Sequence, residues 1–586
     1  MRHPAKLYFL AAAALMMLAA CSSNQAAREE VVSTAAPPPS PRVDLPEAKS
    51  EEDELAAAPA TAAPSAAEQL ANISVTGSRS VGLLYAMRAP AEMELPVDRE
   101  NYAKIDSNPV QRLAENPVST FSIDVDTGAY SNVRRMLNEG RLPPHDAVRV
   151  EELINYFNYA YAAPRDATTP FGVVTEMAPT PWNPKTRLLH IGIQGWKPQG
   201  KRQPSNLVFL VDVSGSMQDT DKLPLVKSSL KLLSGQLTAE DRISLVVYAG
   251  NTGVVLEPTP GNDTAAIQSA LDRLNAGGST NGGAGIALAY AMAEKAFMKN
   301  GNNRVLLATD GDFNVGTVSF EALVDLVEER RKSGVALTTL GFGTGNYNDH
   351  LMERLADAGN GSYAYIDSLT EAQRVLVSQR EATLRTIAKD VKVQIEFNPA
   401  MVAEYRLIGY ENRMLKREDF NNDQIDAGEI GAGHTVTALY EIALKDSGGE
   451  RVDPLRYGKE SHVANGGDDL AFLRLRYKRP EDGMQAASRL IEQPVLLSAM
   501  HEDAGQASPA FRLAAAVAAY GQLLRGGDYT GSFSYRDVVA LAESARSVDA
   551  EAGSFLQLVR LADGLSTKAA STGTAGDRQQ ITPSGG

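Results

Sequence analysis

Two kinds of hydrophobic pattern divide the chain. Between residues 205 and 385, nearly continuous apolar runs such as Leu207–Val211 and Val305–Thr309 alternate with amphipathic stretches of helical period. Strands that are apolar on both faces are typical of parallel sheets covered by helices. This region is therefore predicted to be an α/β domain with a doubly wound, mainly parallel sheet.

The elements expected in this domain follow from the same periodicity. The expected strands are 207–213, 243–249, 305–309, 336–342 and 362–366. The expected helices are 223–237, 264–274, 284–298, 320–332, 349–358 and 370–384. After it, four stretches alternate apolar and polar residues strictly, which predicts antiparallel strands with one exposed face: 391–397, 405–410, 436–444 and 470–477.

The remaining parts of the chain are predicted from composition and local signals. A strand is expected at 119–126, helices at 130–137 and 149–156, and two strands around the turn 181–184. Near the end, 509–525 predicts a helix, Ser534-x-x-Asp537 predicts a capped helix, and 555–561 predicts a third. The predicted parts are a signal peptide 1–20, a disordered tether 21–115, an N-terminal module 116–204, the α/β domain 205–385, a β-rich region 386–485, a helical region 486–570 and a disordered tail 571–586.

The N-terminus has the pattern of a bacterial lipoprotein signal. Arg2 and Lys6 precede the apolar stretch Leu7–Leu18, and Leu18-Ala-Ala-Cys21 resembles a lipobox whose Cys21 becomes lipidated. An ordinary cleaved signal peptide with an incidental cysteine is the alternative. Because Ser22 rather than Asp follows the cysteine, the lipoprotein sorting rule implies the outer membrane, facing the periplasm. The membrane is expected to be contacted only through this lipid anchor.

Charge and residue usage exclude several classes of function. The formal net charge of −15 argues against a nucleic-acid-binding surface, which would need a basic stripe. Seven scattered histidines without zinc-binding spacing, and a single cysteine, exclude the common zinc sites and an internal disulfide. The composition favours an acidic protein that binds other proteins.

Five oxygen-bearing side chains are expected to meet at one edge of the predicted sheet: Asp212, Ser214, Ser216, Thr280 and Asp310. Asp212 and Asp310 each close a buried strand, and Thr280 lies in a glycine-rich loop ahead of a helix. Ligands of open α/β sheets bind beyond the carboxyl ends of the strands. Hydroxyls and carboxylates without His or Cys suit a hard divalent cation, so we expect Mg²⁺ here, with Mn²⁺ or Ca²⁺ as alternatives.

This set resembles the metal-ion-dependent adhesion site of von Willebrand factor type A (VWA) domains. Asp212, Ser214 and Ser216 match the D-x-S-x-S motif, Thr280 the separate threonine and Asp310 the final aspartate. The resemblance implies direct contact of both serine hydroxyls with the ion, Thr280 direct or through water, and the two aspartates largely through water. One coordination position would remain for an acidic side chain of a protein partner.

The flanks resemble a YfbK-like family of bacterial envelope proteins that carry this domain between two other modules. The resemblance rests on residues 121–135 and 431–441. In related domains the last helix, here 370–384, changes position with the geometry of the ion, which gives a candidate moving element. The family resemblance supports the architecture more than a particular biological role.

Catalysis is not expected, although two other readings of the metal site remain open. A metal-assisted hydrolase would need a general base, and the loops around Ser214 and Thr280 contain no His or Glu. The ion could also be purely structural. Asp124-Val125-Asp126 lacks the threonine that a phosphatase of the haloacid dehalogenase type needs, and the turn Asp419–Asp423 lacks the glycine and glutamate of an EF-hand.

Overall fold

The computed structural model describes residues 99–576, except 167, 313–318, 454–466 and 484–485. The signal peptide, Cys21 and most of the predicted tether lie outside the described residues. No helix within the described part is long and apolar enough to cross a membrane.

The α/β domain has the predicted doubly wound sheet, with strand order β10-β9-β8-β5-β6-β7. Its strands are β5 (Ser205–Asp212), β6 (Arg242–Tyr248), β7 (Thr252–Pro260), β8 (Asn302–Thr309), β9 (Ala336–Gly341) and β10 (Tyr363–Tyr365). Every pair is parallel except β6 with β7. β7 was missed by the prediction because this edge strand is only partly buried and carries two prolines.

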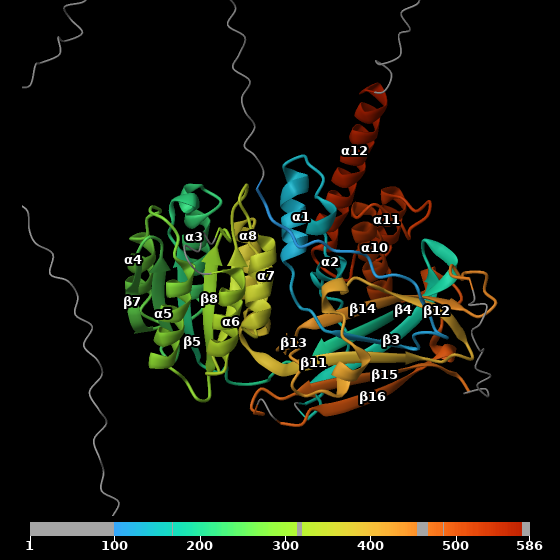
Figure 1. Cartoon of the computed structure of the whole chain (residues 1–586), viewed down its shortest axis with the longest axis horizontal. Coiled ribbons are helices and arrows are strands. Elements are labelled where there is room, and N and C mark those ends of the chain that lie inside the picture. Colours follow the sequence, from blue (N-terminus) through green and yellow to red (C-terminus); the bar gives the residue numbers. More distant parts are fainter. Residues whose placement is uncertain (1–98, 167, 313–318, 454–466, 484–485, 577–586) are drawn as a thin grey trace, which may run out of the picture. The chain divides into compact units, whose positions relative to one another are not determined.

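Helices cover both faces of this sheet and enclose two apolar cores (Figure 1). The helices are α3 (Leu223–Ser234), α4 (Thr264–Asp272), α5 (Gly282–Lys295), α6 (Phe320–Arg331), α7 (Asp349–Ala358), α8 (Leu369–Gln373) and α9 (Arg380–Leu384). One core lies under α3, α4 and α8, and the other under α5, α6 and α7. The predicted parallel sheet with helices on both sides is confirmed.

The predicted single helix 370–384 is wrong in one respect, because it is interrupted. A π-helical turn, Arg374–Ser378, separates α8 from α9. The Gln379 N–H donates to the Arg374 carbonyl at 2.8 Å, a five-residue step that inserts one extra residue into the turn. Hydrophobic periodicity does not reveal such an insertion, since the apolar face continues on both sides of it.

A scaffold of two antiparallel sheets adjoins the α/β domain. One has the order β1-β12-β14-β4-β3; in the other, β13-β11-β15-β16 is joined by β2 on β11. Their bounds are β1 (Gln111–Arg112), β2 (Val118–Ser122), β3 (Phe171–Thr180), β4 (Asn183–Gly195), β11 (Thr386–Phe397), β12 (Val402–Ile408), β13 (Gly428–Gly431), β14 (Thr435–Leu444), β15 (Asp469–Lys478) and β16 (Arg489–Leu496). Segments from before and after the α/β domain share both sheets and one apolar core.

Five helices form the other part of the scaffold. They are α1 (Gly128–Asn138), α2 (Val150–Asn155), α10 (Pro509–Leu524), α11 (Tyr535–Glu543) and α12 (Ala552–Gly576), and they share a core of buried Ala, Leu and aromatic side chains. The predicted capping box of Ser534 and Asp537 is present at the start of α11. Helix α12 continues to Gly576, into the stretch that the sequence predicts as a disordered tail.

Residues 99–115, assigned by the sequence to the tether, are ordered against the folded part. The Arg99 N–H donates to the Gly345 carbonyl at 2.8 Å, and the Asn101 N–H donates to the Tyr347 carbonyl at 2.8 Å. The carboxylate of Glu100 accepts from the Gly345 N–H at 3.0 Å. These contacts are individual hydrogen bonds to a distant loop, which composition does not reveal. Composition alone therefore placed the end of the tether too late in the sequence.

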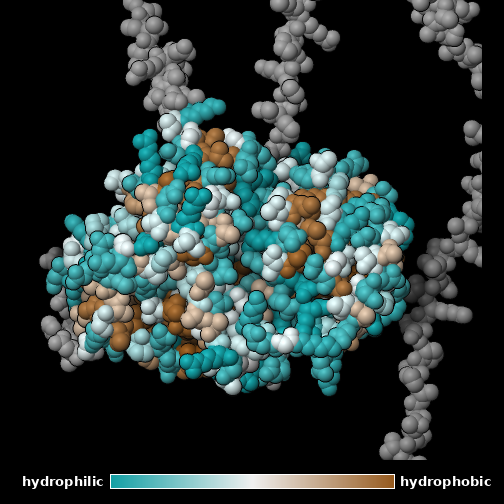
Figure 2. Space-filling view, turned by 180° about the vertical axis from the view of Figure 1, so that it is seen from behind, coloured by the Kyte–Doolittle hydropathy of each residue, from teal (hydrophilic) through white to brown (hydrophobic). Residues whose placement is uncertain are grey.

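The exposed apolar side chains are dispersed over the surface. The face shown in Figure 2 is mostly hydrophilic, with separate apolar patches. The large hydrophobic residues that are exposed come from several different elements, among them Val254, Phe297, Met414, Leu490 and Leu561. Dispersed apolar side chains of this kind are ordinary for a protein surface and need no partner to cover them.

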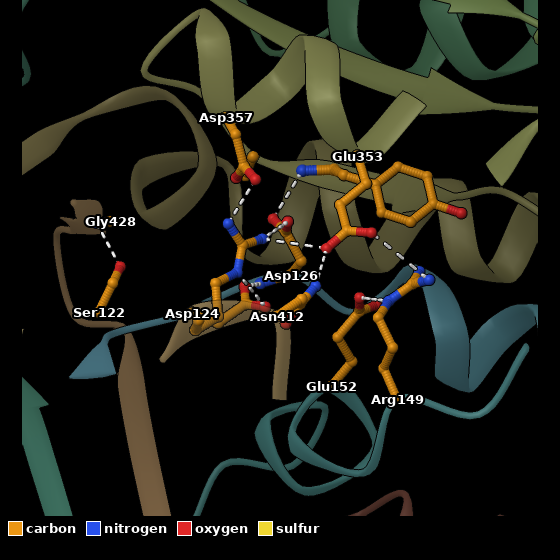
Figure 3. A network of polar contacts seen from close by, with 12 residues as sticks. Ser122, Asp124, Asp126, Arg149, Glu152, Glu353, Asp357, Asn412 and Gly428 are labelled. Carbon is orange, nitrogen blue, oxygen red and sulfur yellow. Dashed lines mark hydrogen bonds and ion pairs between the residues drawn. The ribbon is translucent and has the colours of Figure 1, made fainter. Parts of the chain in front are cut away.

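A buried network of ion pairs joins α7 to the scaffold (Figure 3). Two scaffold arginines, Arg149 and Arg413, contact six carboxyl groups: Asp124, Asp126, Glu152, Asp349, Glu353 and Asp357. The Arg149 side chain is 1% exposed and that of Arg413 is 10% exposed. Three of the six acids lie on α7, so this helix carries half of the carboxyl groups that the two arginines contact.

Carboxyl groups outnumber guanidinium groups in this network, and the pKa values of several of these carboxyl groups are raised. Burial, together with the neighbouring Asp124, raises the pKa of Asp126. Burial also raises the pKa values of Glu152 and Glu353. Next to the network, burial raises the pKa of Glu151 to about 8, and its Oε2 atom has no hydrogen-bond partner among the described residues. Glu151 is therefore expected to be protonated at neutral pH.

We expect Arg413→Met to destabilise the protein by about 3–5 kcal/mol, because its loss leaves buried carboxylates without a counter-charge. Urea denaturation at pH 7 measures this change. Arg536→Met is the control, since the Arg536 side chain is 89% exposed. A loss for Arg413→Met no larger than that of the control would show that the network does not hold the two parts together.

We expect Glu151→Gln to stabilise the protein at high pH but not at low pH. The folded-state pKa of about 8 lies above the ordinary value of 4.5, so the wild-type protein loses stability as pH rises from 4.5 to 8. Glutamine imitates the protonated acid, and the gain at pH 8.5 should be about 2–4 kcal/mol.

Urea denaturation at pH 4.5 and pH 8.5 tests this difference, with exposed Glu328→Gln as the control. Equal effects of Glu151→Gln at both pH values would contradict the raised pKa.

Candidate functional site

The parallel pairing of two central strands places the predicted aspartates at one edge of the sheet. β5 pairs with β8, β5 ends at Asp212, and Asp310 directly follows β8. Both aspartates are fully buried. The D-x-S-x-S motif leaves β5 and turns into a short 3-10 helix, Gly215–Gln218. The edge that the sequence predicted as the ligand site is therefore the place where these residues lie.

Two backbone hydrogen bonds hold the glycine-rich loop against the D-x-S-x-S turn. The Gly215 N–H donates to the Gly278 carbonyl at 3.0 Å, and the Gly277 N–H donates to the Val213 carbonyl at 2.8 Å. Thr280 follows two residues later and is half-buried. The loop positions Thr280, because the Thr280 side chain forms no hydrogen bond with the described residues.

The two serine hydroxyls of the motif lie close together. The Ser214 and Ser216 Oγ atoms are 3.0 Å apart, and the Ser214 N–H donates to Asp212 Oδ1 at 2.8 Å. Adjacent ligands of an octahedral Mg²⁺ with bonds of about 2.0–2.1 Å are separated by about 2.8–3.0 Å. The spacing of the serine hydroxyls fits that geometry.

Each oxygen of Asp212 already accepts a hydrogen bond from the protein. Besides the Ser214 N–H on Oδ1, the Thr309 hydroxyl donates to Oδ2 at 2.8 Å. Burial, followed by repulsion from Asp310, raises the pKa of Asp212 to about 6. Sequence reasoning missed Thr309, although it is the last residue of β8 and its side chain had to lie beside the end of β5.

Asp310 is bound by a buried lysine that the sequence analysis also missed. Lys222 is 3% exposed, and its Nζ lies 3.1 Å from Asp310 Oδ2 and 2.7 Å from Asn346 Oδ1. Asn346 Nδ2 also donates to Asp310 Oδ2 at 3.0 Å. The other oxygen, Oδ1, accepts from the Asp312 N–H at 3.0 Å. The sequence around Lys222 does not indicate its role, because its partners Asp310 and Asn346 lie in distant loops.

The residues present suit a hard divalent cation whose contact with the carboxylates runs through water. Both oxygens of each aspartate are oriented by protein donors, and the two serine hydroxyls are spaced for direct contact. The described part of the chain contains no group of three or more His, Cys, Asp or Glu residues that could hold a metal. A cation here would therefore depend on hydroxyl groups and water as much as on charge.

Two other motifs have structural roles. Asp124 and Asp126 both contact Arg413, and Asp126 Oδ1 also accepts the Tyr363 N–H at 2.7 Å. In the EF-hand-like turn, the backbone carbonyls already bind lysines: Lys392 Nζ donates to the carbonyls of Asp419 and Asn422, and Lys478 Nζ to that of Asp423. Ammonium groups thus lie where a calcium ion would need oxygen ligands.

Family comparisons match three consecutive parts of the chain. The description "von Willebrand factor" matches residues 96–190, "von Willebrand factor type A domain" matches 206–379, and "Uncharacterized protein YfbK, C-terminal" matches 382–565. The middle match contains all five predicted site residues. A VWA domain points to protein–protein interaction or adhesion, and domains of this type commonly bind a divalent metal at the adhesion site.

Individual relatives extend this result over most of the chain. The inter-alpha-trypsin inhibitor heavy chain H3 of Pongo abelii is 26% identical over 263 residues, which are 42% of this chain and 29% of that protein. A solved structure, von Willebrand factor type A from Catenulispora acidiphila, is 15% identical with a TM-score of 0.37, and covers 69% of this chain and 91% of that one. Uncharacterized protein YfbK of Escherichia coli is 47% identical over 477 residues, 79% of this chain and 81% of the relative. The chain therefore belongs to the YfbK family of bacterial proteins with a VWA domain.

Proposed function

We propose that this chain is a cell-envelope lipoprotein that binds a protein partner through a divalent metal-ion-dependent adhesion site. The ion, Mg²⁺ by preference, would be held by Asp212, Ser214, Ser216, Thr280 and Asp310, and an acidic side chain of the partner would complete its coordination. The observation that carries the proposal is the 3.0 Å spacing of the Ser214 and Ser216 hydroxyl oxygens at the carboxyl edge of the sheet. When bound, the ion supplies an electrophilic position for a carboxylate.

The charges around the site support binding of an anion. Asp212 and Asp310 bring two negative charges, and the Lys222 ammonium neutralises one of them. A divalent cation would then leave the site with a net positive charge, which favours a carboxylate from outside. Lys222 thus adjusts how strongly the site attracts both the cation and the partner.

A groove beside the site supports a partner with more than one acidic residue. It has a volume of about 470 Å³ and begins at Met217, directly after Ser216. Lys227 lines this groove, and its ammonium donates to the carbonyls of Asp272 and Leu274, both at 3.0 Å. No described carboxylate forms an ion pair with Lys227, so a second acidic group of the partner would find a counter-charge there.

The proposed location follows from the N-terminal sequence. Lipidation at Cys21 would anchor the chain in the outer membrane, with the folded part in the periplasm. The residues that follow Cys21 would serve as a tether. The net charge of −15 supports a protein partner rather than a nucleic acid.

We propose a role in binding rather than catalysis because of the groups that surround the two aspartates. Their hydrogen-bond partners among the described residues are hydroxyls, backbone amides, Asn346 and Lys222, which position the carboxylates and do not activate water. A further carboxylate, that of Asp312, accepts a hydrogen bond from Asn346 Nδ2 at 3.2 Å and so is also held by a protein donor. Hydrolysis of phosphoesters or peptides that Asp212→Ala abolishes would overturn this part of the proposal.

The function is tested by capturing partners from bacterial envelope extract with Mg²⁺, with EDTA, and with Ser214→Ala. We expect a specific protein to be retained only by the wild-type chain with Mg²⁺, because the variant lacks one proposed direct ligand. Ser279→Ala is the matched control, since Ser279 lies exposed in the neighbouring loop.

The melting temperature of each variant separates adhesion from a structural ion. If Mg²⁺ raises the melting temperature of the wild-type chain and not of Ser214→Ala, while neither retains a partner, the ion is structural. No effect of Mg²⁺ on either measurement would exclude a metal site at these residues.

We expect Lys222→Met to bind Mg²⁺ more tightly, because the ammonium no longer competes with the ion for Asp310. A gain of about tenfold corresponds to roughly 1.4 kcal/mol of relieved repulsion. Isothermal titration calorimetry with MgCl₂ measures it, and Lys231→Met is the control, because Lys231 on helix α3 is partly exposed and pairs with Asp272 instead. Weaker Mg²⁺ binding by Lys222→Met than by the control would show that Lys222 assists the ion instead.

A further inference from the structure

A second polar cavity lies at the opposite end of the VWA sheet from the metal site. Its volume is about 570 Å³, and its walls come from the starts of β8 and β9, the ends of α5 and α6, and the scaffold near Lys389 and Glu481. It also includes Leu384 and Thr386, where the chain leaves the VWA domain. A volume of this size is within the range of about 300–1,000 Å³ that small-molecule sites occupy.

One wall of this cavity is formed by Arg304, a buried arginine that forms no ion pair with a described carboxylate. Arg304 is 4% exposed, and it donates from Nη1 to the Thr338 hydroxyl at 2.6 Å and from Nη2 to the Thr386 hydroxyl at 3.5 Å. Among the described residues its Nε has no hydrogen-bond partner, and the groups that accept from its two other nitrogens are hydroxyls rather than carboxylates. A buried charge of this kind is costly unless something of opposite charge joins it.

Arg304 differs in this respect from the other buried arginines. The described chain buries three more, each with a carboxylate partner: Arg135 with Glu100, Arg149 with Asp349, and Arg406 with Glu441. The absence of a partner for Arg304 is therefore not a general feature of this protein.

The rest of the cavity is also cationic. Lys299, Arg331 and Lys389 line it together with Arg304, whereas Glu481 is the only acidic residue among its described walls. Arg331 pairs with Asp426 outside the lining, but Lys389 donates only to a backbone carbonyl, that of Pro480, at 3.2 Å. Several side-chain amides, including those of Asn302 and Asn360, add further hydrogen-bonding groups.

Glu429 is the carboxyl group with the largest electrostatic effect on Arg304. Burial and the neighbouring Asp426 raise the pKa of Glu429, which favours its neutral form. Glu429 is therefore a weak counter-charge. The cavity keeps a positive potential that an anion from solution can neutralise.

We propose that this cavity binds a phosphate-bearing small molecule, with Arg304 as its main anchor. The guanidinium presents planar, fixed donors that match phosphate oxygens, and a phosphate dianion balances Arg304 together with one rim cation such as Lys389. The cavity is larger than inorganic phosphate alone, so it also has room for a phosphorylated compound. Because the walls come from both the VWA domain and the scaffold, the ligand joins the two parts. The proposal does not depend on the metal site.

The test uses the full chain in metal-free buffer, so that phosphate cannot bind at an occupied metal site. Inorganic phosphate and glycerol 3-phosphate are titrated separately by isothermal titration calorimetry; tighter binding of the second indicates a glycerol-phosphate headgroup, and equal binding a free phosphate. We expect saturable binding with a dissociation constant below about 1 mM. Arg304→Met should weaken it about tenfold or more, since a charged hydrogen bond is lost. Arg330→Met, next to Arg331 on α6, should bind as the wild-type chain does.

Thermal melting distinguishes a ligand anchor from a structural residue. Without phosphate, Arg304→Met should melt at the same or a higher temperature, because an uncompensated charge is removed, and added phosphate should no longer raise it. If that variant does not fold, Lys389→Met provides the second test and should bind phosphate several-fold more weakly. Absence of binding to the wild-type chain at about 10 mM phosphate, or equal binding by Arg304→Met, would overturn the proposal.

Discussion

The need of buried guanidinium groups for carboxylates governs how the VWA domain joins its scaffold. Arg149 and Arg413 come from the scaffold, and α7 supplies Asp349, Glu353 and Asp357 on one helical face, four residues apart. Removing either side would leave unpaired charge in a buried region, which costs several kcal/mol. Sliding α7 by one turn would break these pairs together. The contact therefore fixes the helix in register as well as in position.

That register matters for the metal site because α7 begins directly after the loop that holds Asp310. The Asn348 N–H donates to the Asp310 carbonyl at 3.3 Å, and Asn348 also caps α7 by accepting from the Leu351 N–H at 3.3 Å. Asn346, two residues earlier, binds the Asp310 carboxylate itself. The position of one proposed metal ligand is thus set by a helix that the scaffold holds. The site and the scaffold are therefore connected through the loop before α7 and through α7 itself.

The sequence predicted what depends on local pattern and missed what depends on distant polar contacts. The parallel strands, their helices and the placement of Asp212 and Asp310 followed from apolar runs and strand ends, which are local. The same reasoning could not predict that Lys222 belongs to the site. Its partners, Asp310 and Asn346, are 88 and 124 residues away in the sequence. The π-helical turn and the contacts of Arg99 and Asn101 were missed for a similar reason. Hydrophobic periodicity indicates which face of an element is buried. It does not indicate which polar groups form hydrogen bonds with one another on that face.

The loop 343–348 contacts both the Asp310 side of the metal site and the N-terminal segment. On one side Lys222 and Asp310 lie against it, and on another Arg99 and Asn101 donate to its carbonyl groups. Gly343 has a φ of 80°, and a Cβ at this position would lie 2.3 Å from Lys222 Cγ, so the loop admits no side chain there. Such a loop has little freedom to move without displacing the lysine. A displacement of the N-terminal segment would consequently reach the Asp310 side of the metal site before it reached the sheet.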